Sequence, residues 1–598
     1  MDEHLIFDIE TDGLQATKVH CLVIMDLDGN VTRYREHDES LKQGVERLKQ
    51  ADLLIGHNII GYDLPTLRRL FRCNFRGDIY DTFVTASFHF VGRMQADFTN
   101  PHMPPALANR HSLEAWGHRL RLLKGDYGKQ SDAWDRWTPE MEDYCEQDVR
   151  VTAALYEHLK RANVVEAARE LEQSFYSIMQ MQQEYGFYFD RREAEKLMVR
   201  LEAQAEGLEV ELRSTFRPQE VVKQLVRVPK PQLYDEVTEV DTEEGRRFKC
   251  VKRIPFNPSS RQQIAERLLE LGWKPSDFTP TGQPQVDEST LSEFAPQDER
   301  VKLLLDYLLV RKRLAQLSDG ASGWLKLVGD DDRIHGRVIS AGGTVSHRCA
   351  HVHPNVAQVP RVSSPYGKEC RSLFRADEGR LLVGCDVSGL ELRILSHYLA
   401  RWDKGAYRDQ VLSGDIHTYN QHRAGLPTRD AAKTFIYAFV YGAGDEKLGS
   451  LVGGGKREGK RMRQRFLNEI VGLRELVEGV KAAATKRKCL RAIDGRMLYP
   501  RSSHSALNLL IQSAGAICVK MATVLLVNDL HDRGLTPGLD YGFVAHVHDE
   551  WQIETWPDFA ELIEEVSLSA IVRAGLHFGL RCPLDGEAKT GHTWADTH

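Results

Sequence analysis

The chain of 598 residues is too long for a single hydrophobic core, so several domains are expected. Its formal net charge is −7, and because strong nonspecific DNA binding relies on cations, any such contact requires local clusters of positive charge. The ten cysteines include no Cys-x-x-Cys pair, which argues against a structural zinc site and favours a reducing cytoplasm. The first residues show no basic flank and no long apolar stretch, so neither a signal peptide nor a membrane span is expected.

An acidic strand is predicted close to the N-terminus, where apolar residues surround Asp8 and Glu10. These two acids are two residues apart, so they project from the same face and repel each other unless a cation lies between them. Further along, Asp63 and Asp148 offer two more carboxylates. Tyr144 precedes Asp148 by four residues, so on a helix the two share a face.

Two later segments mark the end of the first domain and an insertion in the next one. Residues 162–184 are predicted to form a helix that leads out of the first domain. Residues 217–253 are polar, interrupted by prolines and mixed in charge. This composition indicates a loop or hairpin insertion rather than part of a core.

A buried strand is predicted at residues 381–383, which form an apolar run. Asp386 follows where the run meets a small, flexible segment, and a helix is predicted from about residue 390. Asp386 therefore lies at a strand–helix junction, where it can face a metal ion. The backbone carbonyl of Val387 offers a hard oxygen ligand to the same ion.

A helix with one chemically distinctive face is predicted after Thr428, a residue suited to capping its N-terminus. Arg429, Lys433, Tyr437 and Tyr441 recur at every fourth position, so they form a stripe along this helix. The stripe suits phosphates at one end and a base or sugar at the other.

A second carboxylate is predicted at a hairpin turn, because residues 543–547 and 551–554 read as two strands around Asp549. Two carboxylates and a basic helix face are what nucleotide transfer requires: ligands for two metal ions and cations for a triphosphate. The order of these motifs predicts a template-directed polymerase. Local positive charge is present at residues 456–465 and 486–491, although a solvated helix face explains either run about equally well.

The chain resembles the family A DNA polymerases, and among them the replicative polymerases of T-seven-type short-tailed bacteriophages. The resemblance covers nearly the whole chain. It rests on His-Ser-Leu-Glu-Ala-Trp-Gly at 111–117, Asn-Pro-Ser-Ser-Arg at 257–261, Ser-Gly-Leu-Glu-Leu-Arg at 388–393, Gly-Asp-Ile-His-Thr at 414–418 and the stretch 429–447.

The resemblance implies a multidomain α/β fold, in which an RNase H-like 3′–5′ exonuclease domain precedes a right-hand polymerase domain of thumb, palm and fingers. The expected limits are 1–175 for the exonuclease, 176–322 for the thumb with its insertion at 217–253, 323–398 for the first palm segment, 399–507 for the fingers and 508–598 for the second palm segment.

For the polymerase site the resemblance implies two Mg²⁺ ions, which Mn²⁺ could replace, bound by Asp386, Asp549 and the carbonyl of Val387, with Glu550 beside them. Lys433, with Arg429 and His417, is expected to grip the triphosphate, and Lys433 to protonate the leaving group. The residues expected to contact the incoming dNTP are Val387, Glu391, His417, Arg429, Lys433, Tyr437 and Tyr441.

Two of these residues, Glu391 and Tyr441, are expected to crowd the 2′ position of the sugar and so reject ribonucleotides. Tyr437 is expected to allow dideoxynucleotides to be incorporated almost as readily as normal ones. Contacts to DNA are expected from Arg348, Asn508, Gln512 and His548. Because minor-groove acceptors are similar for all correct pairs, an arginine and a glutamine there check pair geometry without reading sequence.

The four N-terminal acids, Asp8, Glu10, Asp63 and Asp148, resemble the acidic quartet of the proofreading exonucleases. The resemblance implies that they bind two Mg²⁺ ions and that Tyr144 orients the attacking water.

The expected partners are primer–template DNA and dNTPs, with a helicase–primase alongside, and the enzyme is expected to be a monomer in the cytoplasm, that of a bacterial host if it is viral. In the T-seven-type enzymes a longer, basic insertion in the thumb captures host thioredoxin. Here the segment 217–253 is shorter and mixed in charge, so thioredoxin, a different processivity factor or no factor all remain open.

Three other functions compete with that of a phage replicative polymerase. A cellular family A repair polymerase is the main alternative. A single-subunit RNA polymerase shares the two aspartates and the lysine–tyrosine helix, but Glu391 and the exonuclease motifs count against it. The last is a nuclease whose polymerase half only binds DNA, which any dNTP incorporation would exclude.

Overall fold

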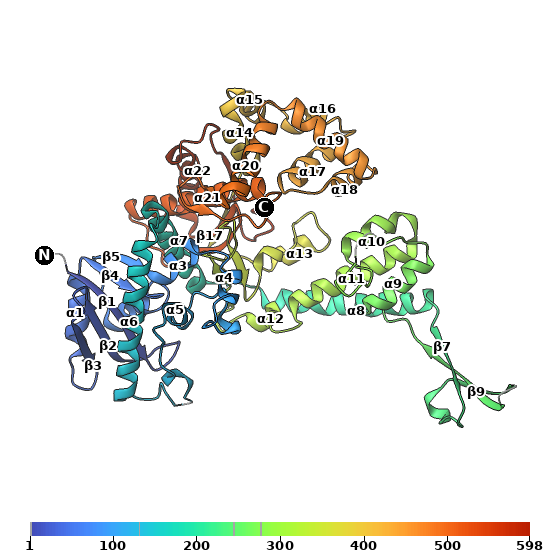
Figure 1. The fold of residues 1–598 in the computed structure, drawn as a ribbon, viewed down its shortest axis with the longest axis horizontal. Coiled ribbons are helices and arrows are strands. Elements are labelled where there is room, and N and C mark those ends of the chain that lie inside the picture. The colour runs from blue at the N-terminus through green and yellow to red at the C-terminus, as the bar shows by residue number, and fades with distance from the viewer. Residues whose placement is uncertain (1–2, 131, 243–244, 276–277) are drawn as a thin grey trace. The chain divides into compact units, whose positions relative to one another are not determined.

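The computed structural model describes residues 3–598 apart from 131, 243–244 and 276–277. The chain divides into two compact units (Figure 1). The first consists of Met1–Phe187, His335–Gln358 and Ala376–His598, and the second of Tyr188–Ile334 and Val359–Arg375. The chain therefore enters the second unit twice.

The N-terminal part of the first unit is built on a five-stranded sheet in the order β3-β2-β1-β4-β5. Its strands are β1 (His4–Thr11), β2 (Val19–Asp26), β3 (Val31–Arg35), β4 (Leu53–Gly56) and β5 (Asp78–Asp81). β1 is antiparallel to β2 and parallel to β4. The predicted acidic strand is thus confirmed, and it lies at the centre of the sheet.

Helices cover both faces of this sheet. The helices of this part are α1 (Leu41–Gln50), α2 (Asp63–Phe71), α3 (Thr82–His89), α4 (Met94–Phe98), α5 (Leu113–Leu120) and α6 (Pro139–Arg161). Leu5, Phe7 and Ile9 of β1 pack in one core with α1 and α2, whereas Ile6 packs in another with α5 and α6. Because side chains alternate along a strand, Asp8 and Glu10 share the Ile6 face and point towards α6.

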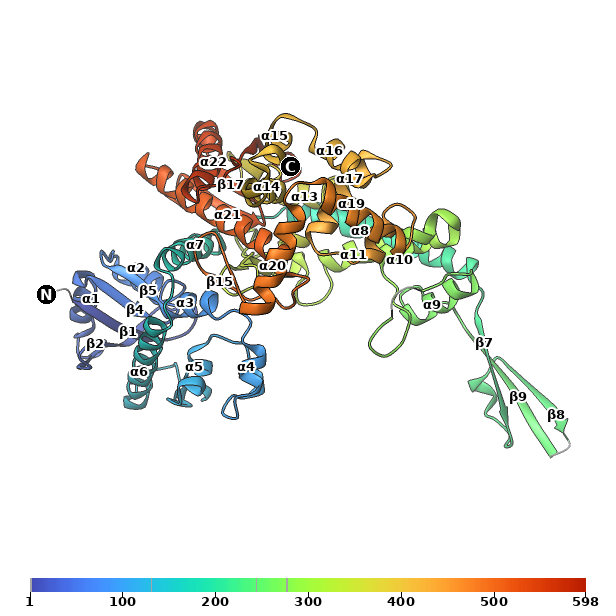
Figure 2. The same cartoon turned by 45° about the horizontal axis from the view of Figure 1, so that its top comes forward.

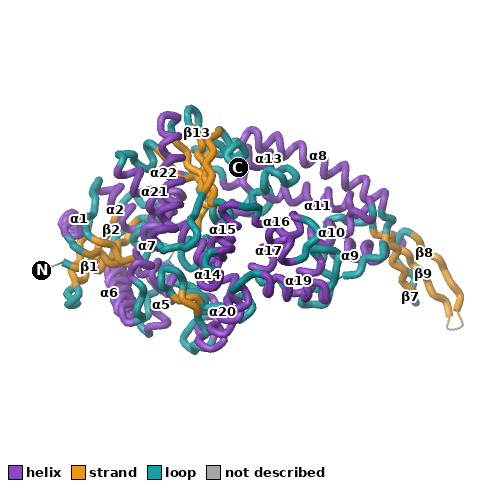
Figure 3. The backbone as a smooth tube through the Cα atoms, turned by 90° about the horizontal axis from the view of Figure 1, so that it is seen from above, coloured by secondary structure: helices purple, strands orange, loops and turns teal. Residues whose placement is uncertain are grey.

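A second sheet, in the order β16-β17-β13-β18, lies in the C-terminal part of the same unit. It contains β13 (Leu381–Val387), β16 (Tyr541–Val547), β17 (Glu550–Thr555) and β18 (Gly586–Gly591), and all its neighbours are antiparallel. Figure 3 shows its strands gathered beside α21 (Ala506–Asp532) and α22 (Pro557–His577), which pack against each other. The predicted strand before Asp386 and the hairpin around Asp549 are both confirmed.

The segment between β13 and α21 is mainly helical. It contains α14 (Leu390–Asp403), α15 (Ala406–Ser413), α16 (Ile416–Ala424), α17 (Arg429–Val440), α18 (Asp445–Ser450), α19 (Lys456–Glu469), α20 (Leu473–Arg487) and the short strands β14 (Leu490–Arg491) and β15 (Met497–Leu498). The strands β11 (Arg337–Ile339) and β12 (Ala350–Val352) also belong to this unit. The core that joins these helices to the second sheet is continuous.

One helix, α7 (Glu166–Tyr185), connects the two sheets. The helix predicted at 162–184 starts late, because α6 extends to Arg161 and Asn163 takes a left-handed conformation with φ 52°. Phe175 and Met179 of α7 are fully buried in the core of the second sheet. This helix therefore links the N-terminal part of the unit to the part that contains the second sheet.

The second unit is helical around a long antiparallel pair, α8 (Arg191–Thr215) and α11 (Glu299–Leu317). It also contains α9 (Arg261–Glu270), α10 (Glu288–Phe294), α12 (Trp324–Leu327) and α13 (Gly367–Ser372). The predicted insertion forms a three-stranded antiparallel sheet of β7 (Gln219–Leu225), β9 (Gly245–Ile254) and β8 (Glu236–Thr242), which extends away from these helices (Figure 2). The predicted hairpin is confirmed, with a third strand added.

Among the described residues, one helix, α21, is long and apolar enough to cross a membrane by length and composition. In this structure 72% of its apolar window is buried. Its apolar surface is therefore used in the protein core.

Candidate active sites

The first site lies at the hairpin of the second sheet, where two acids meet. Asp386 is paired in register with Glu550, and Asp549 lies in the turn that precedes β17. The Val387 amide donates a hydrogen bond of 3.1 Å to the carbonyl of Asp549, which fixes the turn against β13. His548 closes the turn with a left-handed φ of 58°.

The two aspartates have perturbed acidities. Although the Asp386 side chain is exposed on one side, partial burial and the negative charges of Asp549 and Glu550 raise its pKa to about 7. Burial, together with the charge of Glu391, raises the pKa of Asp549 to about 6. Carboxylates that repel each other in this way favour a bound cation between them.

Glu550 differs from these aspartates because its carboxylate already has partners. It is buried, and its Oε1 accepts hydrogen bonds from Gln552 at 2.8 Å and Trp594 at 2.5 Å. His598 lies 3.4 Å from its other oxygen. Glu550 is therefore held by the protein itself, with less freedom to turn towards a ligand.

The basic helix face is confirmed in α17. Thr428 caps the helix by accepting a hydrogen bond from the Ala431 amide. Lys433 is exposed, and no described residue pairs with it. Arg429, in contrast, binds Asp415 at 2.5 Å, which holds the pKa of Asp415 well below its usual range.

Asp415 also caps α16, accepting hydrogen bonds from the His417 and Thr418 amides. The His417 ring lies 6.5 Å from that of Tyr437. Burial and the charges of Arg429 and Lys433 lower the pKa of His417. The predicted triphosphate ligands thus lie together on α16 and α17.

The far end of the stripe reaches a cluster around Glu391 in the first turn of α14. The Glu391 Oε1 atom accepts hydrogen bonds from Tyr441 at 2.9 Å and from Arg348 at 2.7 Å. Burial, together with the charges of Glu391, Asp549 and Asp386, raises the pKa of Tyr437. The structure therefore brings together the predicted residues on α14, α17 and the hairpin.

The remaining predicted DNA contacts lie on α21 and in the hairpin turn. Asn508 and Gln512 are one turn apart on α21, and both are half-buried. The Oδ1 atom of Asn508 is buried without a hydrogen-bond partner in the described structure. His548 is exposed, and its ring lies 6.3 Å from that of His351.

The second site lies between β1 and α6 in the N-terminal part. Oxygens of Asp8 and Glu10 and the Cys145 sulfur lie within 4.8 Å of one another. Asp63, at the start of α2, accepts a hydrogen bond of 3.3 Å from the Ile9 amide. Asp148 is buried, and its Oδ1 atom has no hydrogen-bond partner in the described structure.

Burial is the main influence on the acidities of this quartet. It raises the pKa of Asp63 to about 7 and that of Asp148 to about 6. The pKa values of Asp8 and Glu10 are also raised, by burial and then by neighbouring carboxylates. Burial likewise raises the pKa of the Cys145 thiol, so this sulfur stays protonated and is a poor ligand.

The donors in both sites fit a hard divalent cation. Carboxylate and carbonyl oxygens are the ligands that Mg²⁺, Ca²⁺ and Mn²⁺ prefer. An unpartnered buried carboxylate oxygen such as Asp148 Oδ1 is costly unless a ligand satisfies it.

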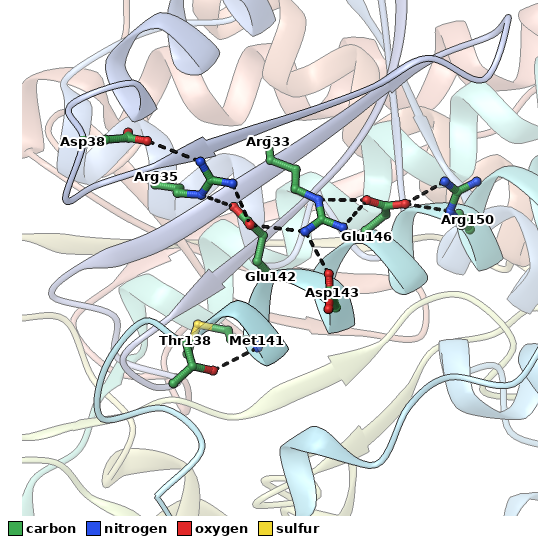
Figure 4. A network of polar contacts seen from close by, with 9 residues as sticks. All are labelled: Arg33, Arg35, Asp38, Thr138, Met141, Glu142, Asp143, Glu146 and Arg150. Atoms are coloured by element: carbon green, nitrogen blue, oxygen red, sulfur yellow. Dashed lines mark hydrogen bonds and ion pairs between the residues drawn. The ribbon is translucent and has the colours of Figure 1, made fainter.

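A salt-bridge network anchors α6 against the edge of the sheet (Figure 4). Arg33 of β3 binds Glu146 at 2.6 Å and Asp143 at 2.8 Å, and Arg35 binds Glu142 at 2.7 Å. These contacts fix the rotation of α6. Tyr144 and Asp148, on another face of the same helix, are thereby directed to β1.

Lys124 is a residue of this site that the sequence pattern did not reveal. Its ammonium forms an ion pair with Asp148 Oδ2 and lies 4.6 Å from the centroid of the Tyr144 ring. Burial and the negative charge of Asp148 raise the pKa of Tyr144 to about 12, whereas the positive charge of Lys124 acts in the opposite direction. Lys124 is in a loop with no periodic pattern, so no sequence signal marked it.

Two sequence-family models match the chain: DNA polymerase family A over residues 232–596, and the RNase H superfamily over residues 5–94. The DNA-directed DNA polymerase of Enterobacteria phage T3 is 34% identical over 705 residues, covering 99% of this chain and 100% of that protein. The corresponding enzyme of Escherichia phage T7 is 34% identical over 708 residues, with the same coverage.

A solved structure shares the fold. It is the POL domain of Pol1 from M. smegmatis in complex with DNA primer-template and dNTP, with a TM-score of 0.76 and 18% identity. The match covers 100% of this chain and 97% of that one. The chain therefore belongs to DNA polymerase family A, and it is a DNA-directed DNA polymerase that carries an RNase H-like exonuclease domain.

Proposed function

We propose that this polymerase replicates a phage genome by two-metal phosphoryl transfer and proofreads its product with the N-terminal exonuclease site. The observation that carries the proposal is the arrangement of the first site. Asp386 on β13 is paired with Glu550, next to Asp549 in the hairpin turn, and Tyr441 at the end of the α17 stripe hydrogen-bonds Glu391 in the first turn of α14, which follows β13. The 34% identity to two phage polymerases over their full length supports the replicative role.

Enzymes of both matched families use divalent metal ions. Under the proposal, Asp386, Asp549 and the Val387 carbonyl hold two Mg²⁺ ions, for which Mn²⁺ can substitute. When bound, such ions align the attacking and leaving oxygens and offset developing charge. Glu550, bound by Trp594 and Gln552, keeps β17 in place behind the aspartates.

The incoming triphosphate is proposed to bind Lys433, Arg429 and His417. Lys433, which no described residue pairs with, donates the proton to the departing pyrophosphate. Arg429 is restrained by Asp415, so its guanidinium is already oriented before a nucleotide arrives. Fixed cations of this kind stabilise charge that develops during transfer.

Selection of the sugar is proposed to depend on Glu391. Tyr441 and Arg348 hold its carboxylate oxygen from two sides, which makes the group rigid. A rigid side chain beneath the sugar excludes a 2′ hydroxyl, whereas a mobile one would move aside. Tyr437 is proposed to supply a hydroxyl near the 3′ position, where a dideoxynucleotide lacks its own.

Contacts to the duplex are proposed for Arg348, Asn508, Gln512 and His548. Asn508 and Gln512 lie one turn apart on α21, and the buried Asn508 Oδ1 atom has unused hydrogen-bonding capacity among the described residues. His548 in the hairpin turn is proposed to contact the primer end.

In the exonuclease site, Asp8, Glu10, Asp63 and Asp148 are proposed to hold two Mg²⁺ ions. Tyr144 is proposed to orient the water that attacks the terminal phosphodiester.

The domain limits are part of the proposal. They place the exonuclease at 1–175, the thumb at 176–322 with its insertion at 217–253, the palm at 323–398 and 508–598, and the fingers at 399–507. The boundary at 175 falls within α7. This helix would then belong to both the exonuclease and the polymerase.

The proposed partners are primer–template DNA, dNTPs and a helicase–primase, with a monomeric chain acting in a bacterial cytoplasm. Alignments of 705 and 708 residues exceed the 598 residues of this chain, so the T3 and T7 enzymes contain segments that it lacks. Whether thioredoxin binds is therefore a question for experiment. A cellular repair polymerase is the alternative function.

Extension of a labelled primer on a long template, with trap DNA limiting each enzyme to one binding event, tests the replicative role. Long products without any added factor, or long products only with thioredoxin, support it and identify the source of processivity. Short products in both cases would favour either the repair alternative or dependence on a different processivity factor. Lys433→Met should reduce extension strongly in either case, and Lys447→Met serves as a charge-matched control.

A further inference from the structure

The loop after α5 carries a lysine into the exonuclease site. Helix α5 ends at Leu120, and Arg121 takes the left-handed conformation that reverses the chain. A side chain on Gly117 would come within 2.8 Å of the Leu122 carbonyl, so only glycine allows the loop to cross the helix this closely. Gln147 of α6 then binds the Leu123 carbonyl at 2.8 Å, immediately before Lys124.

The same loop encloses Tyr144. A Cβ atom on Gly125 would lie 3.4 Å from the Tyr144 ring, and one on Gly128 would lie 3.4 Å from its hydroxyl. The rings of Tyr127 and Trp134 pack against it at 5.9 and 6.2 Å. Tyr144 is therefore held on several sides by residues of one loop.

Lys124 joins this tyrosine to the acidic quartet. Its ammonium forms an ion pair with Asp148 and lies over the Tyr144 ring, 4.6 Å from the ring centroid, and only 22% of the Lys124 side chain is exposed. Tyr144 and Asp148 lie one turn apart on α6, so a single cation between them fixes their separation. We propose that Lys124 is a positioning residue of the exonuclease site, which holds the Tyr144 ring and the Asp148 carboxylate in register for the attacking water.

This inference rests on the proposed roles of Tyr144 and the quartet. It differs from two simpler explanations of the same contact. In the first, Lys124 is only a counter-ion for Asp148 and has no effect on turnover. In the second, Lys124 is needed for the carboxylate cluster to form at all. The three explanations predict different combinations of turnover and metal binding.

The test uses the full-length enzyme with Lys124→Met and Lys124→Arg. The matched control is Lys129→Met, because Lys129 is in the same loop but pairs with exposed Asp126. Digestion of a single-stranded oligonucleotide at saturating Mg²⁺ gives kcat and KM. Binding of Mn²⁺ without DNA, followed by electron paramagnetic resonance and compared with Asp8→Ala/Glu10→Ala, reports the exonuclease site directly.

We expect Lys124→Met to lower kcat roughly 100-fold, since a small misplacement of a reacting group has an effect of this size. KM and polymerase activity should change little, and Mn²⁺ should bind at least as tightly, because a competing cation has been removed. Lys124→Arg, which keeps the charge, should regain part of the rate. In a double variant with Tyr144→Phe, the losses should fall well short of their product.

Unchanged kcat in Lys124→Met would leave only the counter-ion explanation, and weaker Mn²⁺ binding with lower kcat would show disruption of the cluster. Multiplicative losses with Tyr144→Phe, or no recovery in Lys124→Arg, would also overturn the inference. If the unmodified enzyme does not digest DNA, the proposed exonuclease function fails instead. Should Lys124→Met fail to fold, Lys124→Gln in the same assays decides the question.

Discussion

Tyr441 and Glu391 are joined by a hydrogen bond of 2.9 Å between the end of the basic helix and the first turn of α14. The same carboxylate oxygen accepts a 2.7 Å hydrogen bond from Arg348. This oxygen therefore links the helix proposed to face the nucleotide to a loop expected to face the duplex. A carboxylate held by two hydrogen bonds has little freedom to move aside for a sugar that carries a 2′ hydroxyl.

Glu391→Ala should weaken the rejection of ribonucleotides, because it removes both the carboxylate and the partner of Arg348. We expect the preference for dNTP over rNTP in kcat/KM to fall at least about tenfold, or roughly 1.4 kcal/mol. Single-nucleotide incorporation measures this ratio. Tyr441→Phe, which keeps the ring but not the hydrogen bond, should have a smaller effect. An unchanged ratio in Glu391→Ala would place sugar selection elsewhere.

Tyr437→Phe should increase discrimination against dideoxynucleotides, because it removes the hydroxyl proposed to replace the missing 3′ group. The ring itself is retained, and it packs 6.4 Å from that of Tyr441. The measurement is the ratio of kcat/KM for a dNTP and the matching dideoxynucleotide. Tyr419→Phe, on neighbouring α16, is the control. Discrimination that is equal before and after the change at position 437 would refute the role of the hydroxyl.

In the absence of divalent metal, Asp386 and Asp63 should each lower folding stability as the pH rises from about 4 to about 7. In the folded protein the pKa values of Asp386 and Asp63 are raised to about 7, above the ordinary value of 3.8. Within this window the folded state holds protons that the unfolded state has released, so increasing pH favours unfolding. Above pH 7 the effect should level off.

Thermal melting in EDTA at a series of pH values measures this dependence. Added Mg²⁺ at pH 8 should raise the melting temperature, because the cation binds the folded acids. Asp386→Asn with Asp63→Asn should flatten the profile. A double variant whose profile has the same slope as that of the unmodified enzyme across this window would contradict the assigned acidities.

A fully buried ion-pair cluster joins α7 to the polymerase core. Glu172 binds Arg496 at 2.5 Å and Lys520 at 2.8 Å, and Lys520 also donates to the Ser340 carbonyl at 2.8 Å. Glu172→Gln should lower the free energy of unfolding by about 3 kcal/mol, since it leaves the buried Lys520 ammonium without a counter-charge, whereas Arg496 still pairs with Asp494. Urea denaturation measures the change.

The double variant Glu172→Gln/Lys520→Met is the control for this cluster. It should be less destabilised than the sum of the two single variants, because it removes both charges together. If the free energy of unfolding of Glu172→Gln equals that of a variant changed at an exposed position, such as Glu170→Gln, the cluster does not stabilise the folded state.

Much of the polymerase site was predictable because its residues fall on short, regular elements. The four-residue spacing of Arg429, Lys433 and Tyr437 defines a helix face whatever the fold around it. The apolar runs on each side of Asp549 define a hairpin in the same way. Local periodicity was sufficient for both.

The parts that were missed depend on contacts between distant segments. Lys124 reaches Asp148 from a loop 24 residues earlier, and Trp594 reaches Glu550 from 44 residues later. Neither contact leaves a periodic pattern in the sequence. The break before α7 was missed because it depends on the left-handed conformation of Asn163, within residues that otherwise suit a helix.

A primer with a mismatched 3′ end, supplied with all four dNTPs and Mg²⁺, tests most directly the claim that one chain contains two independent active sites. The unmodified enzyme should remove the mismatch and then extend the primer. Asp8→Ala/Glu10→Ala should lose removal at least about 1000-fold, or roughly 4 kcal/mol, yet still extend a matched primer. Asp386→Ala should remove nucleotides without extending. Loss of both activities in either variant would contradict the two-site account.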